Sequence, residues 1–401
     1  MHSIKKSVAG ALAALAVSAP CTAQISDGIV KIGLVVDLTS LYADVTGQGV
    51  IEAMKMAITD AGGLVNGKRI ELIAGDYQNK PDIAASKARE WVDKEGVDLL
   101  VAATNSSAAL AVARVAHEKR RPLLVVSTGT ARLTNEECNP YTIHYGYDTV
   151  ALARGTGSAV VKQGGKSWYF LTADYAFGSS LEKDTSDVVK ASGGTVLGSV
   201  RHPLSASDFA SFLLQAQSSK AQVLGLANAG ADTVNAIKAA RDFNVTKTMK
   251  MAGLILFVND IHALGLDLAQ GMYLTDSWYW DQNEKSRAWS KRYFEKMKKM
   301  PNAIQASGYS ATAHYLASVK ASGTDGSDKV IAHMKAAPIR DMLTPSGVIR
   351  PDGRMVSDLY LRQVKSPAES KYPWDYFKGG DRIPGAEAFT TKEESKCPLW
   401  K

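Results

Sequence analysis

The stretch IVKIGLVVDL, residues 29–38, is apolar at almost every position, which predicts a buried β-strand. A helix is predicted over residues 49–61, where Val50 and Met54 begin an apolar stripe with a spacing of four. A second strand is predicted over residues 69–75. This strand–helix–strand order favours a parallel sheet with helices packed against its faces.

The same alternation continues along the chain. Strands are predicted over residues 98–103 and 122–126, with a helix over residues 106–119 between them. A polar, irregular stretch over residues 134–147 then interrupts the pattern. After it, strands are predicted over residues 168–173, 196–200, 222–227 and 249–256, separated by helices near 180–191, 207–217 and 232–242. The interruption predicts two doubly wound, mainly parallel α/β sheets, and such folds bind ligands at the carboxyl ends of their strands.

The C-terminal third departs from this alternation. Long amphipathic helices are predicted over residues 286–300 and 303–321, and a β-hairpin over residues 347–364 with its turn at residues 351–353. The segment from Ser366 is rich in proline, glycine and charge, so we expect it to wrap around the surface.

The chain has 401 residues, more than the roughly 100–200 typical of one domain, which favours two domains with separate cores. Its start carries two lysines, an apolar run over residues 8–19 and then small residues. That order predicts a secretory signal peptide over residues 1–23, cleaved after Ala23, and therefore a mature protein located outside the cytoplasm. The run is shorter than the ~20 residues that span a bilayer. A lipid anchor on Cys21 is the alternative, although Pro20 is a poor residue before a lipidated cysteine.

Charge places few limits on the partners of this protein. The formal net charge of +7 falls to +5 once the two lysines of the signal peptide are removed (7 − 2). A modest positive balance favours anionic ligands, but it says little about specific partners. The basic residues are interspersed with acids, so no nucleic acid partner is expected.

Cys138 and Cys397 remain after cleavage, and an even pair in an oxidising compartment predicts a disulfide. The alternative is two free thiols. Two distant cysteines without a cluster of histidines do not suggest a zinc site, so neither a metal nor a cofactor is predicted.

The sequence carries little that points to catalysis. We find no Gly-x-Ser-x-Gly elbow, no His-Glu-x-x-His helix, no phosphate loop ending in Gly-Lys-Ser/Thr and no Gly-x-Gly-x-x-Gly after the first strand. The seven histidines are expected to be surface or packing residues. The chain is therefore predicted to bind a ligand and to catalyse nothing.

Small hydroxyl residues follow two neighbouring predicted strands. Residues 104–107 (Thr-Asn-Ser-Ser) follow one strand and begin a helix, and residues 127–130 (Ser-Thr-Gly-Thr) follow the next strand. Hydroxyls and free backbone N–H groups at a helix N-terminus suit a carboxylate, because the orphan donors and the helix dipole both favour negative charge. The alternative is that Asn105 or Ser106 only caps the helix. The two segments at one sheet edge together predict a carboxylate site.

Taken together, the chain resembles the periplasmic leucine/isoleucine/valine-binding family, the receptors of hydrophobic amino acid ABC importers. The resemblance covers nearly the whole mature chain, and its most specific stretches are residues 29–33 (IVKIG), 60–72 (DAGGLVNGKRIEL), 105–107 (NSS), 127–131 (STGTA) and 174–178 (DYAFG). It implies a two-lobed type I periplasmic binding fold. Each lobe is then an open α/β sheet, three crossovers form the hinge, and the ligand is enclosed between the lobes.

The resemblance also implies which residues bind the ligand. The carboxylate-binding serine of the family corresponds to Ser106, and two further contacts to the carboxylate and ammonium groups correspond to Thr128 and Thr130. The aromatic residue that covers the ligand corresponds to Phe177, unless Phe177 belongs to the core. The other positions implied for the site are Tyr42, which is otherwise an exposed loop residue, together with Ser107, Tyr175 and Asn228.

One departure from the family pattern bears on the ligand. Amino acid binders of the family place an acid of the second lobe against the α-ammonium, and residues 253–257 (GLILF) have none at the corresponding strand end. An ammonium buried without its partner costs about 3–5 kcal/mol, at least a hundredfold in affinity. We therefore expect a carboxylate with an apolar or aromatic body, although Asp174 or Asp232 could replace the acid. Residues 278–281 (WYWD) either line the cleft or pack near the hinge.

The resemblance predicts lobe boundaries and partners. The first lobe is placed at residues 28–145 and 276–345, the second at residues 146–275 and 346–368, and a tail held by the disulfide at residues 369–401. The expected role is capture of a small molecule for the permease subunits of an ABC importer. The alternatives are a receptor for a sensory pathway, a true branched-chain amino acid binder and a secreted hydrolase.

Overall fold

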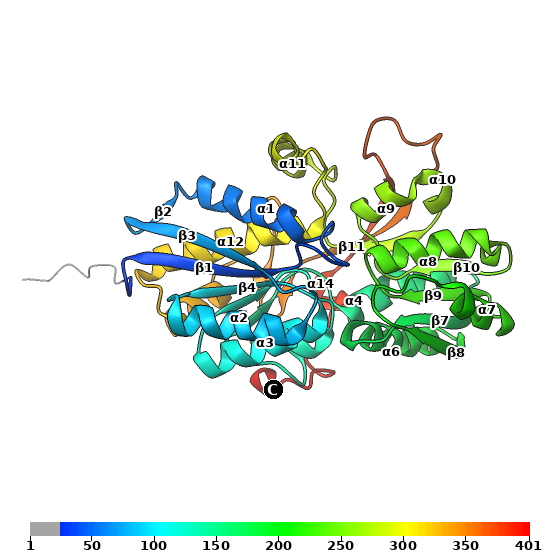
Figure 1. The fold of residues 1–401 in the computed structure, drawn as a ribbon, viewed down its shortest axis with the longest axis horizontal. Helices are drawn as coiled ribbons and strands as arrows, with labels where there is room; N and C mark the ends of the chain where they lie inside the picture. The colour runs from blue at the N-terminus through cyan, green and yellow to red at the C-terminus, as the bar shows by residue number, and fades with distance from the viewer. Residues whose placement is uncertain (1–24) are drawn as a thin grey trace, which may run out of the picture.

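The computed structural model describes residues 25–401. Its two largest sheets consist mainly of parallel strands and lie end to end (Figure 1). The first sheet has six strands in the order β2-β3-β1-β4-β5-β6, and every pairing except β2 with β3 is parallel. We call this sheet and its helices the first lobe. Its strands are β1 (Ile29–Val36), β2 (Leu64–Val65), β3 (Lys68–Asp76), β4 (Leu99–Ala103), β5 (Leu123–Val125) and β6 (Thr142–His144).

Helices cover both faces of the first sheet, which explains why β1 is apolar along its whole length. Ile32 and Leu34 belong to a core shared with two helices on one face, whereas Val35 packs with two helices on the other face. The first pair is α1 (Gly47–Asp60) and α12 (Ala303–Ser322), and the second is α2 (Pro81–Lys94) and α3 (Ser106–Lys119). Two further helices of the chain are α11 (Glu284–Met297) and α13 (Ser327–Ala336).

The second sheet has four parallel strands in the order β10-β9-β7-β8, and with its helices it forms what we call the second lobe. Its strands are β7 (Ser167–Ala173), β8 (Thr195–His202), β9 (Val223–Ala227) and β10 (Lys250–Gly253). The helices that follow these strands are α6 (Ala176–Ala191), α7 (Ala210–Ser218), α8 (Ala231–Asp242) and α9 (Val258–Leu264). The shorter helical segments are η1 (Ala131–Thr134), α4 (Thr149–Leu152), η2 (Ala153–Gly157), α5 (Ser158–Lys162), η3 (Val245–Lys247), α10 (Leu266–Ala269), α14 (Gly385–Ala388) and η4 (Pro398–Trp400). The two sheets agree with the predicted doubly wound α/β fold.

The C-terminal strands differ from the prediction. Instead of one hairpin over residues 347–364, β12 (Val348–Ile349) and β13 (Met355–Val356) form a short one, and β14 (Leu359–Val364) joins a separate antiparallel sheet with β11 (Tyr273–Asp276). The predicted surface tail supplies the third strand of that sheet, β15 (Phe377–Ile383). The sequence of β15, FKGGDRI, does not predict a strand, because glycine weakens strands and because charged residues are tolerated in a strand mainly at the edge of a sheet.

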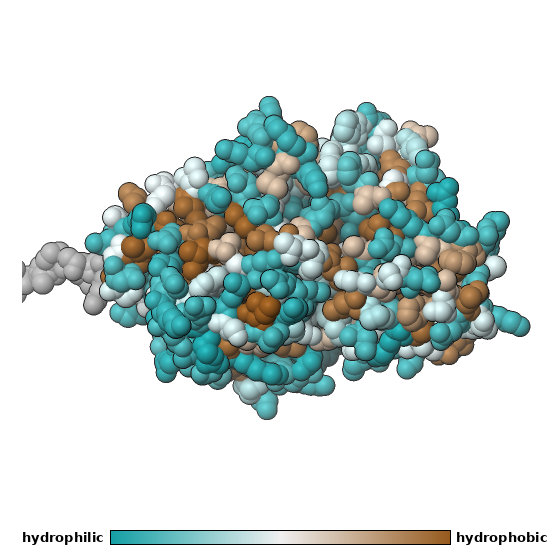
Figure 2. All heavy atoms as spheres, in the orientation of Figure 1, coloured by the Kyte–Doolittle hydropathy of each residue, from teal (hydrophilic) through white to brown (hydrophobic). Residues whose placement is uncertain are grey.

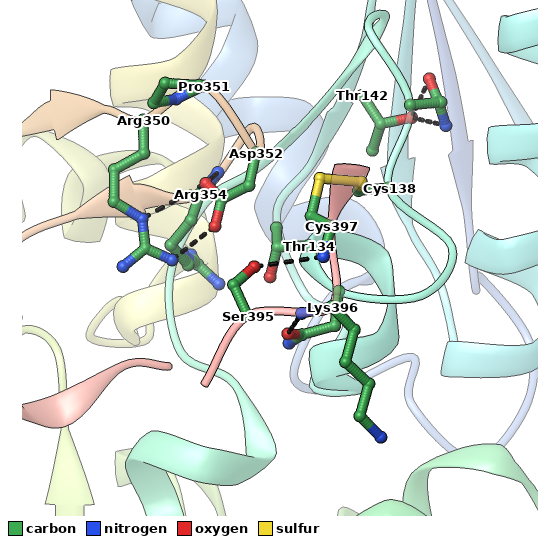
Figure 3. The surroundings of a disulfide bond; sticks show 12 residues. Thr134, Cys138, Thr142, Arg350, Pro351, Asp352, Arg354, Ser395, Lys396 and Cys397 are labelled. Carbon is green, nitrogen blue, oxygen red and sulfur yellow. Dashed lines mark hydrogen bonds and ion pairs between the residues drawn. A yellow bond between two sulfur atoms is a disulfide. The ribbon is translucent and has the colours of Figure 1, made fainter. Parts of the chain in front are cut away.

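The predicted disulfide is present between Cys138 and Cys397, with 5.7 Å between the two Cα atoms (Figure 3). It fastens the C-terminal end beside the β12–β13 hairpin, where Arg350 donates to Asp352. Two further hydrogen bonds hold the same segment, because Arg154 donates to the carbonyl oxygens of Phe389 at 2.8 Å and of Glu387 at 3.0 Å. Arg154 lies in η2, so the C-terminal segment contacts both the first-lobe side at Cys138 and the helical stretch that leads into the second lobe.

Within residues 25–401, the structure has no helix that is both long and apolar enough to cross a membrane. The predicted signal peptide, residues 1–23, and its alternative lipid anchor at Cys21 lie outside the described residues. Hydrophilic residues predominate on the face shown in Figure 2, with hydrophobic ones gathered in smaller groups between them.

Replacing Cys138 and Cys397 together by serine is expected to lower the free energy of unfolding by up to about 4–5 kcal/mol on the chain-entropy model, because the bond spans 259 positions of the sequence. Urea unfolding of the wild-type and double-variant proteins measures the difference. A reducing agent should destabilise the wild type by the same amount and leave the variant unchanged. Equal stabilities of the oxidised wild type and the variant would contradict this expectation.

Candidate functional site

A cavity with about 380 Å³ of empty space lies between the two lobes, where the carboxyl ends of their strands face each other. None of the described residues that line the cavity has a charged side chain. The lining residues are Tyr42, Val45, Thr46, Thr104, Asn105, Ser106, Ser127, Thr128, Gly129, Tyr147, Tyr175, Phe177, Ala229, Phe257 and Ile304.

Ser106 supplies a free hydroxyl donor at the start of α3. Asn105 is the residue that caps this helix, since its side chain accepts a hydrogen bond from the amide of Ala108 at 2.8 Å. The oxygen of Ser106 accepts the amide proton of Thr130 at 3.3 Å. Its own hydroxyl proton therefore remains for a ligand, next to first-turn amides that have no partner within the helix.

The loop after β5 is held to the loop after β4 by two hydroxyl donors. Ser127 and Thr128 both donate to the carbonyl oxygen of Thr104, at 3.1 and 2.9 Å. The hydroxyl proton of Thr128 is thus already used, and the group can offer a ligand only a lone pair. The amides of this loop and the hydroxyl of Ser106 are consequently the donors that a carboxylate would meet on this wall.

Two buried side chains also hold this loop in place. Tyr147 donates to the carbonyl oxygen of Ser127 at 2.6 Å, and the Nε2 atom of His144 lies 2.6 Å from the carbonyl oxygen of Thr128. Because a carbonyl oxygen only accepts, Nε2 carries the proton. Burial lowers the pKa of His144 well below its usual value, so the ring stays neutral and contributes no charge to the site.

The wall from the second lobe is mainly apolar. Phe177 lies in α6 and Phe257 directly precedes α9, and both are nearly fully buried. Phe177 approaches the loop of the first lobe so closely that a Cβ atom on Gly129 would lie 2.4 Å from its ring. Only glycine fits at this point, so Gly129 sets how near the two walls can come.

Polar contacts join the lobes around the cavity. The hydroxyl groups of Tyr42 and Tyr175 are 2.6 Å apart, and those of Thr130 and Ser180 are 2.9 Å apart. Burial raises the pKa of both tyrosines, so each phenol is neutral at physiological pH. The structure is therefore that of a closed form, in which neutral groups hold the walls together.

The structure places five of the eight predicted ligand contacts in the cavity wall, namely Tyr42, Ser106, Thr128, Tyr175 and Phe177. The other three side chains lie elsewhere. Thr130 is buried against Ser180, Asn228 is buried between His202 and Thr233, and Ser107 is half-buried in the first turn of α3.

Neither predicted substitute for the missing acid reaches the cavity. Asp174 is exposed and pairs with Arg201 at 3.4 Å. Asp232 is buried and accepts the amide proton of Ser205 at 3.1 Å, and burial raises its pKa to about 6. The wall of the second lobe therefore presents no carboxylate to a ligand.

Several lining residues were missed by the sequence analysis. Phe257 could have been found, since it follows β10 at the carboxyl end of the second sheet. Tyr147 lies in the stretch predicted to be irregular, where no periodic pattern distinguishes it. Conversely, the aromatic stretch at residues 278–281 packs away from the cavity: Trp278 donates to the carbonyl of Met342, and Tyr279 to that of Trp374.

Comparison with solved structures supports the same fold. A periplasmic binding protein from Burkholderia mallei is 62% identical, with a TM-score of 0.92 over 93% of this chain and 100% of that one. A branched chain amino acid ABC transporter periplasmic ligand-binding protein from Burkholderia xenovorans is 37% identical, with a TM-score of 0.82 and the same coverage. An ABC transporter solute-binding protein from R. palustris in complex with benzoate shares the fold at 22% identity, with a TM-score of 0.79 over 92% of this chain and 100% of that one.

Sequence comparisons agree with these structures. A Leu/Ile/Val-binding protein homolog from Brucella melitensis is 23% identical over 377 residues, which cover 90% of this chain and 94% of that protein. The family model for periplasmic binding proteins matches residues 29–371. The chain therefore belongs to the periplasmic binding protein family, as a leucine-binding-like substrate-binding protein of the ABC transporter type.

Proposed function

We propose that this protein captures a small carboxylate with an apolar or aromatic body and delivers it to the permease of an ABC importer, without catalysing a reaction. One observation carries the proposal: the cavity offers hydrogen-bond donors on one wall and apolar side chains on the other, and none of the described residues that line it is charged. The permease would recognise the closed form of the two lobes.

The polar wall suits a carboxylate. Hydrogen bonds to a charged group stabilise it by about 1.5–3 kcal/mol each, more than bonds between neutral groups. Ser106 contributes a hydroxyl proton, and the N-terminus of α3 contributes amides and a favourable dipole. An anion can therefore be held here without a cationic side chain.

The same cavity is unfavourable for the α-ammonium of an amino acid. A buried ammonium would meet only neutral acceptors, because no acid lines the cavity and the nearby Asp232 points to the amide of Ser205. Phe177 and Phe257 line the cavity on the side of the second lobe, and their rings suit an apolar body. The benzoate complex of the R. palustris protein supports a ligand of this chemical class.

We also infer that the mature protein begins after Ala23 in the periplasm, and that the lobes divide as predicted, with the first at residues 28–145 and 276–345. The second lobe would then comprise residues 146–275 and 346–368, followed by the tail. The family to which the chain belongs is extracytoplasmic, which supports the proposed location.

Leucine and 4-methylpentanoate form a matched pair for testing the ligand class, since they differ only in the ammonium group. We expect 4-methylpentanoate or benzoate to bind at least about a hundredfold more tightly than leucine, because an unpaired buried ammonium costs about 3–5 kcal/mol. Isothermal titration calorimetry on protein freed of co-purified ligand measures the three affinities. Tight leucine binding without binding of either acid would refute the proposal.

Replacing Ser106 by alanine is expected to weaken binding of the acid by about 1.5–3 kcal/mol, because the carboxylate loses a hydroxyl donor. Replacing Ser107 by alanine is the matched control, since the side chain of Ser107 lies outside the cavity lining while its amide is unchanged. Calorimetry with the same acid compares the two variants. Equal affinities in the two variants would place the carboxylate elsewhere.

A further inference from the structure

Two phenol groups meet in the cavity, one from each lobe. Tyr42 follows β1, and its amide is anchored to Asp37 at 2.9 Å, directly after that strand. Tyr175 immediately precedes α6 of the second lobe. Both residues line the cavity, and their hydroxyl oxygens are 2.6 Å apart.

This pair has hydrogen-bonding capacity left over. Each phenol carries one proton, and the bond between them uses only one of the two. Neither hydroxyl makes another hydrogen bond within residues 25–401. One proton and several lone pairs therefore remain for a molecule in the cavity, and an unused buried donor is unfavourable unless it finds a partner.

The other lining tyrosine does not share this property. Tyr147 donates its proton to the carbonyl oxygen of Ser127 at 2.6 Å, which holds the binding loop. Its hydroxyl is therefore committed to the protein. Of the tyrosines that line the cavity, only Tyr42 and Tyr175 can donate to a ligand without breaking a bond to the backbone.

The order of the strands separates Tyr42 from the carboxylate donors along the edge of the first sheet. Tyr42 lies beyond β1, Ser106 beyond β4 and Thr128 beyond β5, and the three strands are neighbours in that order. The tyrosine pair and the carboxylate donors therefore line different parts of the same cavity. A ligand that bonds at both places needs a second polar group away from its carboxylate.

We propose that the Tyr42–Tyr175 pair is a second polar subsite that selects ligands with an uncharged oxygen opposite their carboxylate, as in a 4-hydroxy aromatic acid. This inference rests on the proposed function. A hydroxyl both accepts the unused phenol proton and donates to a phenol lone pair. A second carboxylate is disfavoured here, because the pair has only one proton left to donate and a carboxylate cannot donate to the phenol lone pairs.

The test compares benzoate with 4-hydroxybenzoate by isothermal titration calorimetry. The wild type is expected to bind 4-hydroxybenzoate about tenfold more tightly than benzoate, the effect of one net hydrogen bond. In the double variant Tyr42→Phe/Tyr175→Phe the ratio should fall to about one. Removing both partners of a hydrogen bond while keeping both rings is nearly neutral for folding, so the double variant is expected to remain folded.

Tyr147→Phe is the matched control, because it removes a lining hydroxyl whose proton is already used. It should preserve the tenfold preference even if the affinity for both acids falls. The absence of a preference in the wild type, or its persistence in the double variant, would overturn the subsite and leave the carboxylate proposal intact. Failure of the wild type to bind either acid would overturn both proposals.

Discussion

The carbonyl oxygen of Thr104 accepts hydrogen bonds from both Ser127 and Thr128, and the polar wall of the cavity depends on this convergence. It draws the loop after β5 against the loop after β4, so that the amide of Thr130 reaches the oxygen of Ser106. These bonds use the hydroxyl protons of Ser127 and Thr128 and the amide proton of Thr130, which are then not available to the ligand. The donors that remain, chiefly the hydroxyl proton of Ser106 and the first-turn amides of α3, are consequently directed at the cavity.

The first lobe contributes polar groups to the cavity and the second contributes apolar ones, and the cost of removing a charge from water explains why the polar groups are needed. An anion that leaves water must find donors, and the first lobe supplies them from backbone and hydroxyl groups that need no counter-ion. The second lobe adds Phe177 and Phe257, which lose water-exposed apolar surface when the lobes approach. The hydroxyl contacts that join the lobes at the cavity are between neutral groups, and a ligand can shift closure only by binding the closed form better than the open one.

The alternating strands and helices could be predicted from the sequence better than the C-terminal strands and the loops of the site. The helix predicted at residues 106–119 is α3 to the residue, because its cap and its apolar stripe are both local features. The strand β15 could not be predicted, since its pairing with β14 depends on a distant segment and its composition is that of a loop. The rule that ligands meet strand ends identified Ser106 and Thr128, but it could not tell which way Thr130 points, because its contact with Ser180 of the other lobe decides this.

A buried arginine, Arg354, holds the segment that leads from the first lobe into the second and that also contacts the binding loop. Arg354 is fully buried and donates to the carbonyl oxygen of Gly146, in the segment that carries His144 and Tyr147 to the loop. Burial lowers the pKa of Arg354 to about 10, so it stays charged at neutral pH, and Phe389 of the C-terminal segment covers it. A buried cation is costly unless it is paired, and here the carboxylate of Asp148 lies 3.7 Å from the guanidinium of Arg354. The disulfide fastens the C-terminal segment whose Phe389 covers Arg354, and Arg354 in turn bonds to Gly146 next to Tyr147 of the cavity wall.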